Sequence, residues 1–136
     1  MTDIRQVTPE FAVAPQLAPQ DMAAVAALGF RRVINNRPDH EAPGQPTGAQ
    51  MEAAAIAAGM DYVAIPVVGG PSPAQVIENH AAIESAPGPV LAFCRSGTRS
   101  IISWSLGQLQ AGARSREDLV QLGEAAGYDL SMALPR

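Results

Sequence analysis

The chain has 136 residues, of which 47% are hydrophobic and 16% charged, and its net charge is −4. This length and composition predict one globular domain over residues 1–136 and exclude a disordered chain. The acidic balance, with no Lys and Arg run among aromatic residues, argues against nucleic-acid and membrane partners. The single cysteine forms no internal disulfide, and residues 1–11 carry no apolar signal core, so we expect a cytoplasmic protein.

The first half of the chain predicts two strands and two helices. Residues 10–14 form the first strand candidate, and an Ala-rich helix follows over residues 20–28, with apolar side chains at three-residue spacing. Residues 32–35 predict the next strand. A loop rich in Pro and polar residues covers residues 36–47, and its last residue is a Thr that can cap a helix over residues 48–58.

The second half continues the alternation of strands and helices. Residues 62–67 predict a strand with a Pro near its end, which is typical of an edge strand. A helix over residues 73–85 begins with a Ser cap and a Pro. The continuous apolar run at residues 90–93 is typical of a strand buried on both faces. Helices are then predicted over residues 101–110 and 115–127.

Strands that alternate with helices of about a dozen residues predict an α/β fold. We expect a single-domain three-layer sandwich, in which a central, mostly parallel sheet is flanked by helices on both faces. Right-handed crossovers would bring the carboxyl ends of the strands to one edge, where ligands bind in such sheets. The loops that follow Asn35, Val67 and Phe93 would all open at that edge.

The loop after the buried strand has the composition of an anion-binding site. Cys94 is its first residue, and Gly97 allows backbone N–H groups to turn inward. A helix begins at about Thr98 or Arg99, so its positive end faces the same concavity. Arg99 can hold an oxyanion with two parallel hydrogen bonds, and Ser100 can donate to the sulfur. The anion-binding candidates in this loop are Arg95, Ser96, Gly97, Thr98 and Ser100.

These neighbours predict that Cys94 is a catalytic thiolate. A thiol at a helix N-terminus beside an arginine ionises readily, and the thiolate is the nucleophilic form. The alternative is a structural cysteine at a strand end, because free cysteines are often small apolar core residues. A packing site has no need for the polar run Arg-Ser-Gly-Thr-Arg-Ser that follows, so we favour catalysis or anion binding.

Four segments of the chain, one of which contains the Cys94 loop, resemble a known family. They are APQL at 14–17, GFRRVINNRPDHE at 29–41, GMDYVAIPV at 59–67 and FCRSGTRS at 93–100. Together they resemble the beta-lactamase-hydrolase-like (Blh) phosphatase-like domain family, within the protein tyrosine and dual-specificity phosphatase-like superfamily. The resemblance implies a dual-specificity-phosphatase-like fold, with Cys94 as nucleophile and Arg99 as the oxyanion ligand.

Two features depart from ordinary tyrosine phosphatases. Their loop has five residues between Cys and Arg, whereas this one has four, and a smaller ring of amides suits a smaller anion or a persulfide sulfur. Their general-acid Asp follows a strand like residues 65–67, but here the sequence VVGGPSPAQ holds no acid. Asp39, His40 or Glu41 in the loop after the second strand could supply the proton, and Arg37 could steer an anion. We take Asp39 as the catalytic candidate and Glu41 and Arg37 as substrate-binding ones.

Three functions remain open from the sequence. The first is a phosphatase-like hydrolase that cleaves a phosphomonoester through a phosphocysteine on Cys94. The second is a rhodanese-type sulfurtransferase that carries a persulfide on the same residue, and the third is an anion-binding module with weak catalysis. Each implies a small anionic substrate, either a phosphoester or a sulfane-sulfur donor. None of them requires a metal or an organic cofactor, and the sequence leaves the oligomeric state open.

Overall fold

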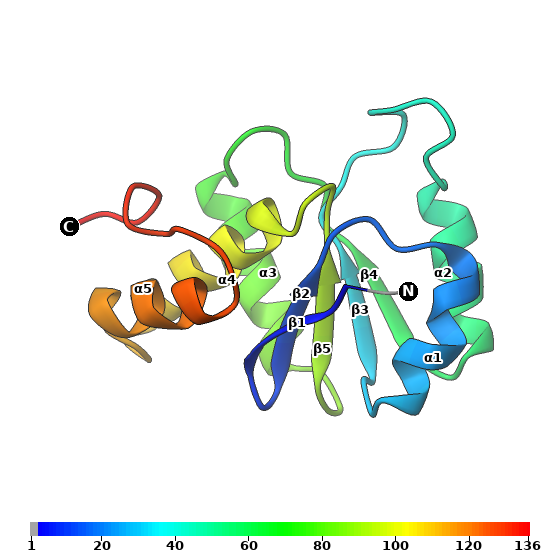
Figure 1. The fold of residues 1–136 in the computed structure, drawn as a ribbon, viewed down its shortest axis with the longest axis horizontal. Helices are drawn as coiled ribbons and strands as arrows, with labels where there is room; N and C mark the ends of the chain where they lie inside the picture. The colour runs from blue at the N-terminus through cyan, green and yellow to red at the C-terminus, as the bar shows by residue number, and fades with distance from the viewer. Residues whose placement is uncertain (1–2) are drawn as a thin grey trace.

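One five-stranded sheet organises the computed structural model, which describes residues 3–136 (Figure 1). The strands are β1 (Arg5–Thr8), β2 (Phe11–Ala14), β3 (Arg32–Asn35), β4 (Asp61–Ala64) and β5 (Val90–Phe93). Their order across the sheet is β1-β2-β5-β3-β4. The last four of these run parallel to one another, and only β1 is antiparallel to its neighbour β2. The predicted mostly parallel sheet is confirmed.

Helices cover both faces of this sheet. They are α1 (Met22–Ala27), α2 (Gly48–Ala57), α3 (Pro73–Glu84), α4 (Thr98–Gln110) and α5 (Arg116–Ala125). In Figure 1, α1 and α2 lie on one side of the sheet, and α3, α4 and α5 lie on the other. This arrangement is the predicted three-layer sandwich.

The two faces follow from the alternation of side chains along each strand. On β2, Phe11 and Val13 point into the core shared with α4 and α5, where the Phe11 ring stacks on Trp104 at 5.1 Å between centroids. Ala12 and Ala14 point into the opposite core, which α1 and α2 close. All four residues of β2 and of β5 are buried, because both strands are covered on both faces.

Three helices begin at the hydroxyl caps that the sequence predicts. In each case the hydroxyl oxygen accepts a hydrogen bond from the backbone N–H three residues later, which satisfies one of the free donors of the first turn. The pairs are Thr47 with Gln50, Ser72 with Gln75 and Ser115 with Asp118.

The structure differs from the sequence prediction at three elements. Strand β1 was not predicted, because its sequence RQVT shows no clean alternation. The strand expected over 62–67 is β4, which ends at Ala64, and the chain continues with single backbone hydrogen bonds to the end of β3. The helix expected over 20–28 starts with a short 3₁₀ turn at Pro19–Asp21 before α1.

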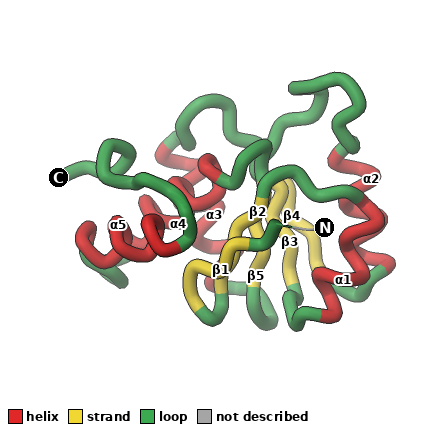
Figure 2. Tube along the Cα trace, in the orientation of Figure 1, coloured by secondary structure: helices red, strands yellow, loops and turns green. Residues whose placement is uncertain are grey.

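The parallel strands end at one edge of the sheet, and their loops gather there (Figure 2). These are the loops that follow β2, β3, β4 and β5, and they carry most of the polar residues singled out above. Within residues 3–136, no helix is long and apolar enough to cross a membrane.

Candidate active site

Cys94 lies at the first position of the turn that joins β5 to α4. Backbone hydrogen bonds join the turn to the end of β2 and the loop that follows it. The backbone N–H of Gln16 donates to the Arg95 carbonyl at 3.2 Å, and that of Cys94 donates to the Ala14 carbonyl at 3.4 Å. Gly97 is the residue before α4 and has a φ of 92°, a left-handed conformation that favours glycine. The turn therefore needs the glycine that the sequence places there.

The sulfur of Cys94 faces the start of α4. The Gly97 N–H donates a hydrogen bond to Cys94 Sγ at 3.1 Å. The amino end of α4 carries a partial positive charge, which favours a negative charge at this position. Cys94 is 0% exposed, so the sulfur is covered in this state of the protein.

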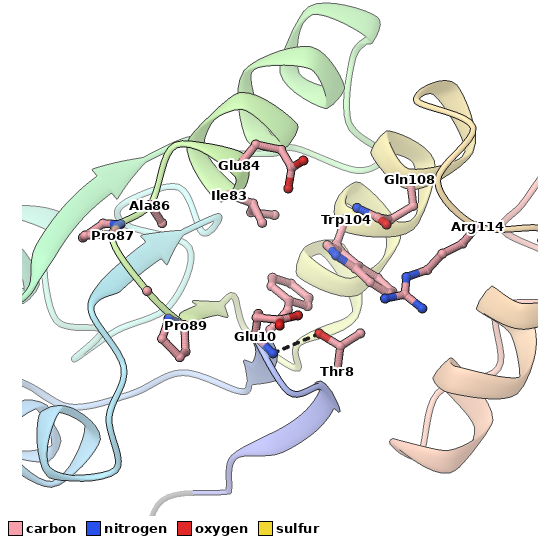
Figure 3. Close-up of a pocket in the computed structure, with 12 residues that line it drawn as sticks. Thr8, Glu10, Ile83, Glu84, Ala86, Pro87, Pro89, Trp104, Gln108 and Arg114 are labelled. Carbon is pink, nitrogen blue, oxygen red and sulfur yellow. Dashed lines mark hydrogen bonds between the residues drawn. The ribbon is translucent and has the colours of Figure 1, made fainter.

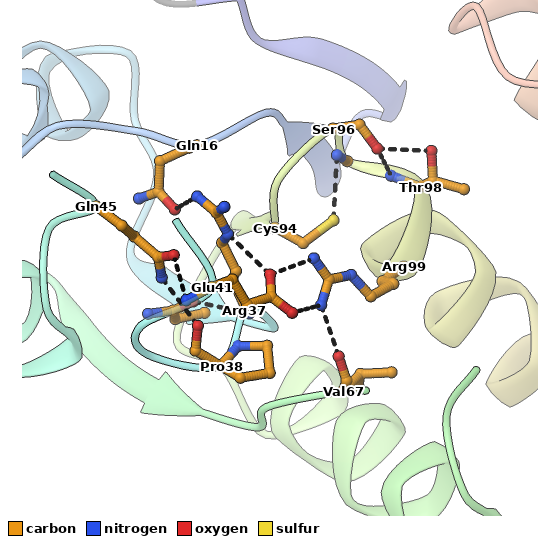
Figure 4. A network of polar contacts seen from close by, with 12 residues as sticks. Gln16, Arg37, Pro38, Glu41, Gln45, Val67, Cys94, Ser96, Thr98 and Arg99 are labelled. Carbon is orange, nitrogen blue, oxygen red and sulfur yellow. Dashed lines mark hydrogen bonds and ion pairs between the residues drawn. The ribbon is translucent and has the colours of Figure 1, made fainter. Parts of the chain in front are cut away.

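Arg99, in the first turn of α4, is held by an acidic side chain from a distant loop (Figure 4). Its two terminal nitrogens donate to the two carboxylate oxygens of Glu41 at 2.9 and 2.8 Å, and one of them also donates to the Val67 carbonyl at 2.7 Å. The carboxylate accepts both parallel hydrogen bonds of the guanidinium. The planar fork of the guanidinium is thus already arranged for two oxygens.

Glu41 is ionised in this arrangement. Hydrogen bonds from Arg99, opposed by partial burial and reinforced by Arg37, lower the pKa of Glu41 from 4.5 to about 2. Arg37 is 6% exposed, and its Nε donates to Glu41 Oε1 at 2.9 Å. Its Nη1 donates to Gln16 Oε1 at 3.1 Å, which ties the loops after β2 and β3 together.

The structure brings most of the predicted site residues together, but Asp39 is used elsewhere. The Gly48 N–H donates to Asp39 Oδ1 at 2.7 Å, so this carboxylate satisfies a free donor at the start of α2. In this structure the Asp39 carboxylate therefore contacts the amino end of α2 and not the Cys94 loop. Glu41, expected only to bind substrate, is the carboxylate at Arg99. His40, between them, is exposed and has a φ of 65°.

The small polar residues of the loop have separate local contacts. Ser96 Oγ donates to Thr98 Oγ1 at 2.9 Å, and both side chains are exposed at the start of α4. Arg95 is also exposed. Ser100 is fully buried, and within residues 3–136 its hydroxyl makes no hydrogen bond, so the expected bond to the sulfur is absent from this state.

Sequence reasoning missed two residues that touch the site. The backbone N–H of Gln16 donates to the Cys94 loop, and the side chain of Gln16 accepts a hydrogen bond from Arg37. Tyr128, which follows α5, donates its hydroxyl to the Ser96 carbonyl at 2.8 Å. Gln16 lies in the APQL segment, so a local signal existed, but no pattern around Tyr128 points to a loop 32 residues earlier.

A separate cavity of about 360 Å³ lies at the opposite edge of the sheet (Figure 3). It opens beside Glu10 and Pro89, which precede the parallel strands β2 and β5, and Trp104 and Arg114 form another wall. It shares no residue with the Cys94 loop. The candidate site residues lie at the other edge, at the carboxyl ends of the strands, where ligands usually bind in parallel sheets.

The sheet order, the buried strand and a cysteine turn at a helix N-terminus place this chain among phosphatase-like domains of the tyrosine and dual-specificity phosphatase fold, although its turn is one residue shorter. The family model described as "Beta-lactamase hydrolase-like protein, phosphatase-like domain" matches residues 3–113. The chain belongs to this family, which confirms the resemblance drawn from the sequence.

Curated relatives support the same assignment. A beta-lactamase hydrolase-like protein of Agrobacterium fabrum is 38% identical over 129 residues, which cover 94% of this chain and 30% of that protein. A protein of the same name from Xylella fastidiosa strain Temecula1 is 34% identical over 132 residues, which cover 96% of this chain and 31% of that protein. The chain thus spans under a third of the length of these relatives.

Solved structures share the fold over almost the whole chain. A candidate phosphatase from Neisseria meningitidis superposes with a TM-score of 0.85 at 30% identity, covering 97% of this chain and 94% of that one. A second from Shewanella putrefaciens gives 0.77 at 24% identity, with coverages of 96% and 82%. TpbA from P. aeruginosa, crystallised as a Cys-to-Ser variant with phosphotyrosine, gives 0.66 at 15% identity, with 93% and 75% covered.

Proposed function

We propose that this domain is a cysteine-dependent hydrolase of phosphomonoesters that works through a phosphocysteine on Cys94. The observation that carries the proposal is the geometry of one turn. Cys94 Sγ accepts the Gly97 N–H at the amino end of α4, and Arg99 presents its guanidinium fork from the first turn of the same helix. A nucleophile and an oxyanion ligand on one rigid turn are what in-line attack on a phosphate requires.

The reaction has two displacement steps. The thiolate of Cys94 attacks phosphorus, the S–P bond forms, and the bond from phosphorus to the ester oxygen breaks as that oxygen takes a proton. Arg99 and the amides of the turn hold the remaining phosphate oxygens. Water then attacks phosphorus, the S–P bond breaks, and inorganic phosphate leaves while the thiolate is regenerated.

Substrate binding requires Glu41 to release Arg99, because carboxylate and phosphate would use the same two donors. A displaced Glu41 loses the hydrogen bonds that lower its pKa, and a neighbouring phosphate dianion would raise it further. Glu41 can then hold the proton that the leaving oxygen needs. We therefore place the general acid at Glu41, ahead of the Asp39 assignment made from sequence.

The proton-donor assignment is tested with two leaving groups. Glu41→Gln should slow an alkyl phosphate by about a hundredfold or more, but slow an activated aryl phosphate much less, because a phenolate leaves unprotonated. Asp39→Asn is the matched control and should leave the ratio of the two rates unchanged. Equal losses on both substrates in Glu41→Gln would remove Glu41 from proton transfer, and a changed ratio in Asp39→Asn would restore Asp39.

Two observations favour a second candidate, rhodanese-type sulfur transfer. The turn has four residues between Cys94 and Arg99, and the loop after β4 supplies the Val67 carbonyl but no acid. In this reaction the thiolate attacks the sulfane sulfur of a donor such as thiosulfate, and sulfite leaves without protonation. The Cys94 persulfide then passes that sulfur to an acceptor thiolate.

A paired assay of one preparation separates these functions. It compares phosphate release from p-nitrophenyl phosphate with thiocyanate formation from thiosulfate and cyanide, in the wild type and in Cys94→Ser. We expect phosphate release in the wild type and its loss in Cys94→Ser, since a serine hydroxyl stays protonated at neutral pH. Thiocyanate formation faster than phosphate release would favour rhodanese-type sulfur transfer. Phosphate binding without either reaction would favour the anion-binding module, and full turnover in Cys94→Ser would exclude the cysteine mechanism.

A further inference from the structure

The first residues after α5 contact the Cys94 turn, and the chain then runs away from the sheet to its C-terminus (Figure 1). Tyr128 follows Gly127, whose φ is 94°, and its backbone N–H donates to the Gly123 carbonyl at 2.8 Å. Its hydroxyl reaches the Ser96 carbonyl, 32 residues earlier, at 2.8 Å. This segment lies outside residues 3–113, which the family model matches, so the match assigns no role to Tyr128.

The carbonyl that Tyr128 binds belongs to the peptide unit that faces the sulfur. The carbonyl of Ser96 and the N–H of Gly97 are the two ends of one planar peptide, and in a trans peptide they point in opposite directions. Tyr128 donates to the carbonyl end, while the N–H end donates to Cys94 Sγ at 3.1 Å. A bond that fixes one end of this plane therefore fixes the direction of the other.

We propose that Tyr128 is a positioning residue that stabilises the Cys94 thiolate through the Ser96–Gly97 peptide. Its hydrogen bond orients the Gly97 N–H toward the sulfur and polarises that N–H, since donors and acceptors in a chain strengthen one another. The inference rests on the proposed function only in that Cys94 reacts as a thiolate. Phosphoryl transfer and sulfur transfer both require this form.

The surroundings of Tyr128 keep its hydroxyl a donor and its ring in place. Burial raises the pKa of Tyr128, an effect that Arg5 opposes and the Cys94 sulfur reinforces, so the phenol stays protonated at neutral pH. Arg5 lies over the ring at 5.5 Å from its centroid and donates to the Ala126 carbonyl at 3.1 Å. A side chain at Gly97 would collide with the Tyr128 hydroxyl, so the contact is close.

Other charged groups also act on the sulfur, and the test has to separate them from Tyr128. Arg99 faces it from α4, where the hydrogen bond to Glu41 raises the pKa of Arg99 and the Cys94 sulfur adds to this effect. Glu41, with its second partner Arg37, acts on it through the ion pair to Arg99. Arg5 faces the phenol from β1. A substitution of Tyr128 that removes only the hydroxyl leaves all of these charges in place.

The experiment measures thiolate absorbance at ~240 nm against pH, with the spectrum of Cys94→Ser subtracted to remove tyrosine ionisation. Because the chain has a single cysteine, the difference reports Cys94 alone. In Tyr128→Phe we expect the midpoint of the titration to rise by about half a unit to one unit, the size of one lost hydrogen bond. At a pH below the wild-type midpoint, turnover should fall about three- to tenfold, and it should recover as the pH passes the new midpoint.

Leu134→Ala is the structural control, because Leu134 belongs to the same C-terminal segment and packs in the apolar core. It should lower the melting temperature and leave the midpoint unchanged. An unchanged midpoint in folded Tyr128→Phe overturns the inference, and so does an equal shift in Leu134→Ala. If Tyr128→Phe does not fold, 3-fluorotyrosine at position 128, a stronger donor, must lower the midpoint. A shifted midpoint in a protein that hydrolyses no phosphoester would reject the proposed function and retain this inference.

Discussion

Among single residues, Arg99 with its planar guanidinium fork is the one on which the proposed anion binding would depend most. It makes three hydrogen bonds, two of them to one carboxylate. Arg99→Lys keeps the charge but loses the second parallel bond, so we expect kcat/KM to fall about ten- to a hundredfold. Arg31→Lys, an exposed arginine before β3, should have no effect. Steady-state kinetics decides, and equal activity of the Arg99→Lys variant and the wild type would exclude bidentate binding.

Glu41 is a second single residue with a testable role, because its ion pairs should make the stability of the fold depend on pH. Because the folded state lowers the pKa of Glu41 from 4.5 to about 2, its contribution is complete above pH 4.5 and disappears as the pH falls toward 2. Since the carboxylate is partly exposed, we expect its ion pairs to contribute about 1 kcal/mol to the free energy of unfolding. Thermal unfolding of Glu41→Gln should therefore differ from wild type near neutral pH and coincide with it near pH 2.

Glu52→Gln is the matched control for this titration, since Glu52 is exposed on α2. Its melting temperature should follow that of the wild type throughout the pH range. If Glu41→Gln and Glu52→Gln behave alike near neutral pH, the ion pairs of Glu41 contribute nothing measurable to stability.

At the scale of elements, the turn between β5 and α4 depends on the left-handed Gly97. Gly97→Ala adds backbone strain of about 1–2 kcal/mol and a collision with the Tyr128 hydroxyl. Gly59 has a similar φ, +87°, but a side chain there would meet nothing within 4 Å, so Gly59→Ala is the control. Both variants should be destabilised, but only Gly97→Ala should lose most of its turnover. Melting curves and kinetics of the pair test this, and similar activities would show that the turn tolerates distortion.

The elements show which information is local in the sequence. Apolar runs, hydroxyl caps and glycines placed β2, β3, β5 and the helices, because each signal lies inside the element it defines. The four parallel strands of the sheet follow from that alternation. Strand β1 escaped prediction because its pairing with β2 and the bulge at Gln6–Thr8 stabilise a polar sequence that has no pattern of its own.

The site divides in the same way. The placement of Cys94 and Arg99 on one turn was predictable because one short segment contains the strand, the turn and the helix start. The contact of Arg99 with Glu41 spans 58 residues, and that of Tyr128 with Ser96 spans 32. Such contacts depend on which strands are neighbours and on how the chain returns, so local patterns do not show that Glu41, and not Asp39, is the carboxylate that contacts Arg99.

For the whole molecule, the segment beyond the family-defining residues is part of the core. Leu119 of α5 is 0% exposed and packs in the core with Ile101 and Trp104. Leu119→Ala should lower the free energy of unfolding by about 2–5 kcal/mol. Leu28→Ala, at a side chain 68% exposed, should change it by less than about 0.5 kcal/mol. Chemical denaturation measures both, and a small effect at Leu119 would show that α5 is dispensable.

The covered sulfur has a consequence for chemical damage. A thiolate exposed to peroxide is oxidised to sulfenic acid, and this chain has no second cysteine to convert that acid into a protective disulfide. Further oxidation to the sulfinic acid would then be irreversible for the domain alone. Because Cys94 is fully buried in this structure, its sulfur is shielded from oxidants in this state. In the proposed mechanism a substrate has to reach this sulfur, and a site open to substrate is also open to oxidants, so resistance to peroxide should depend on how often the site is open.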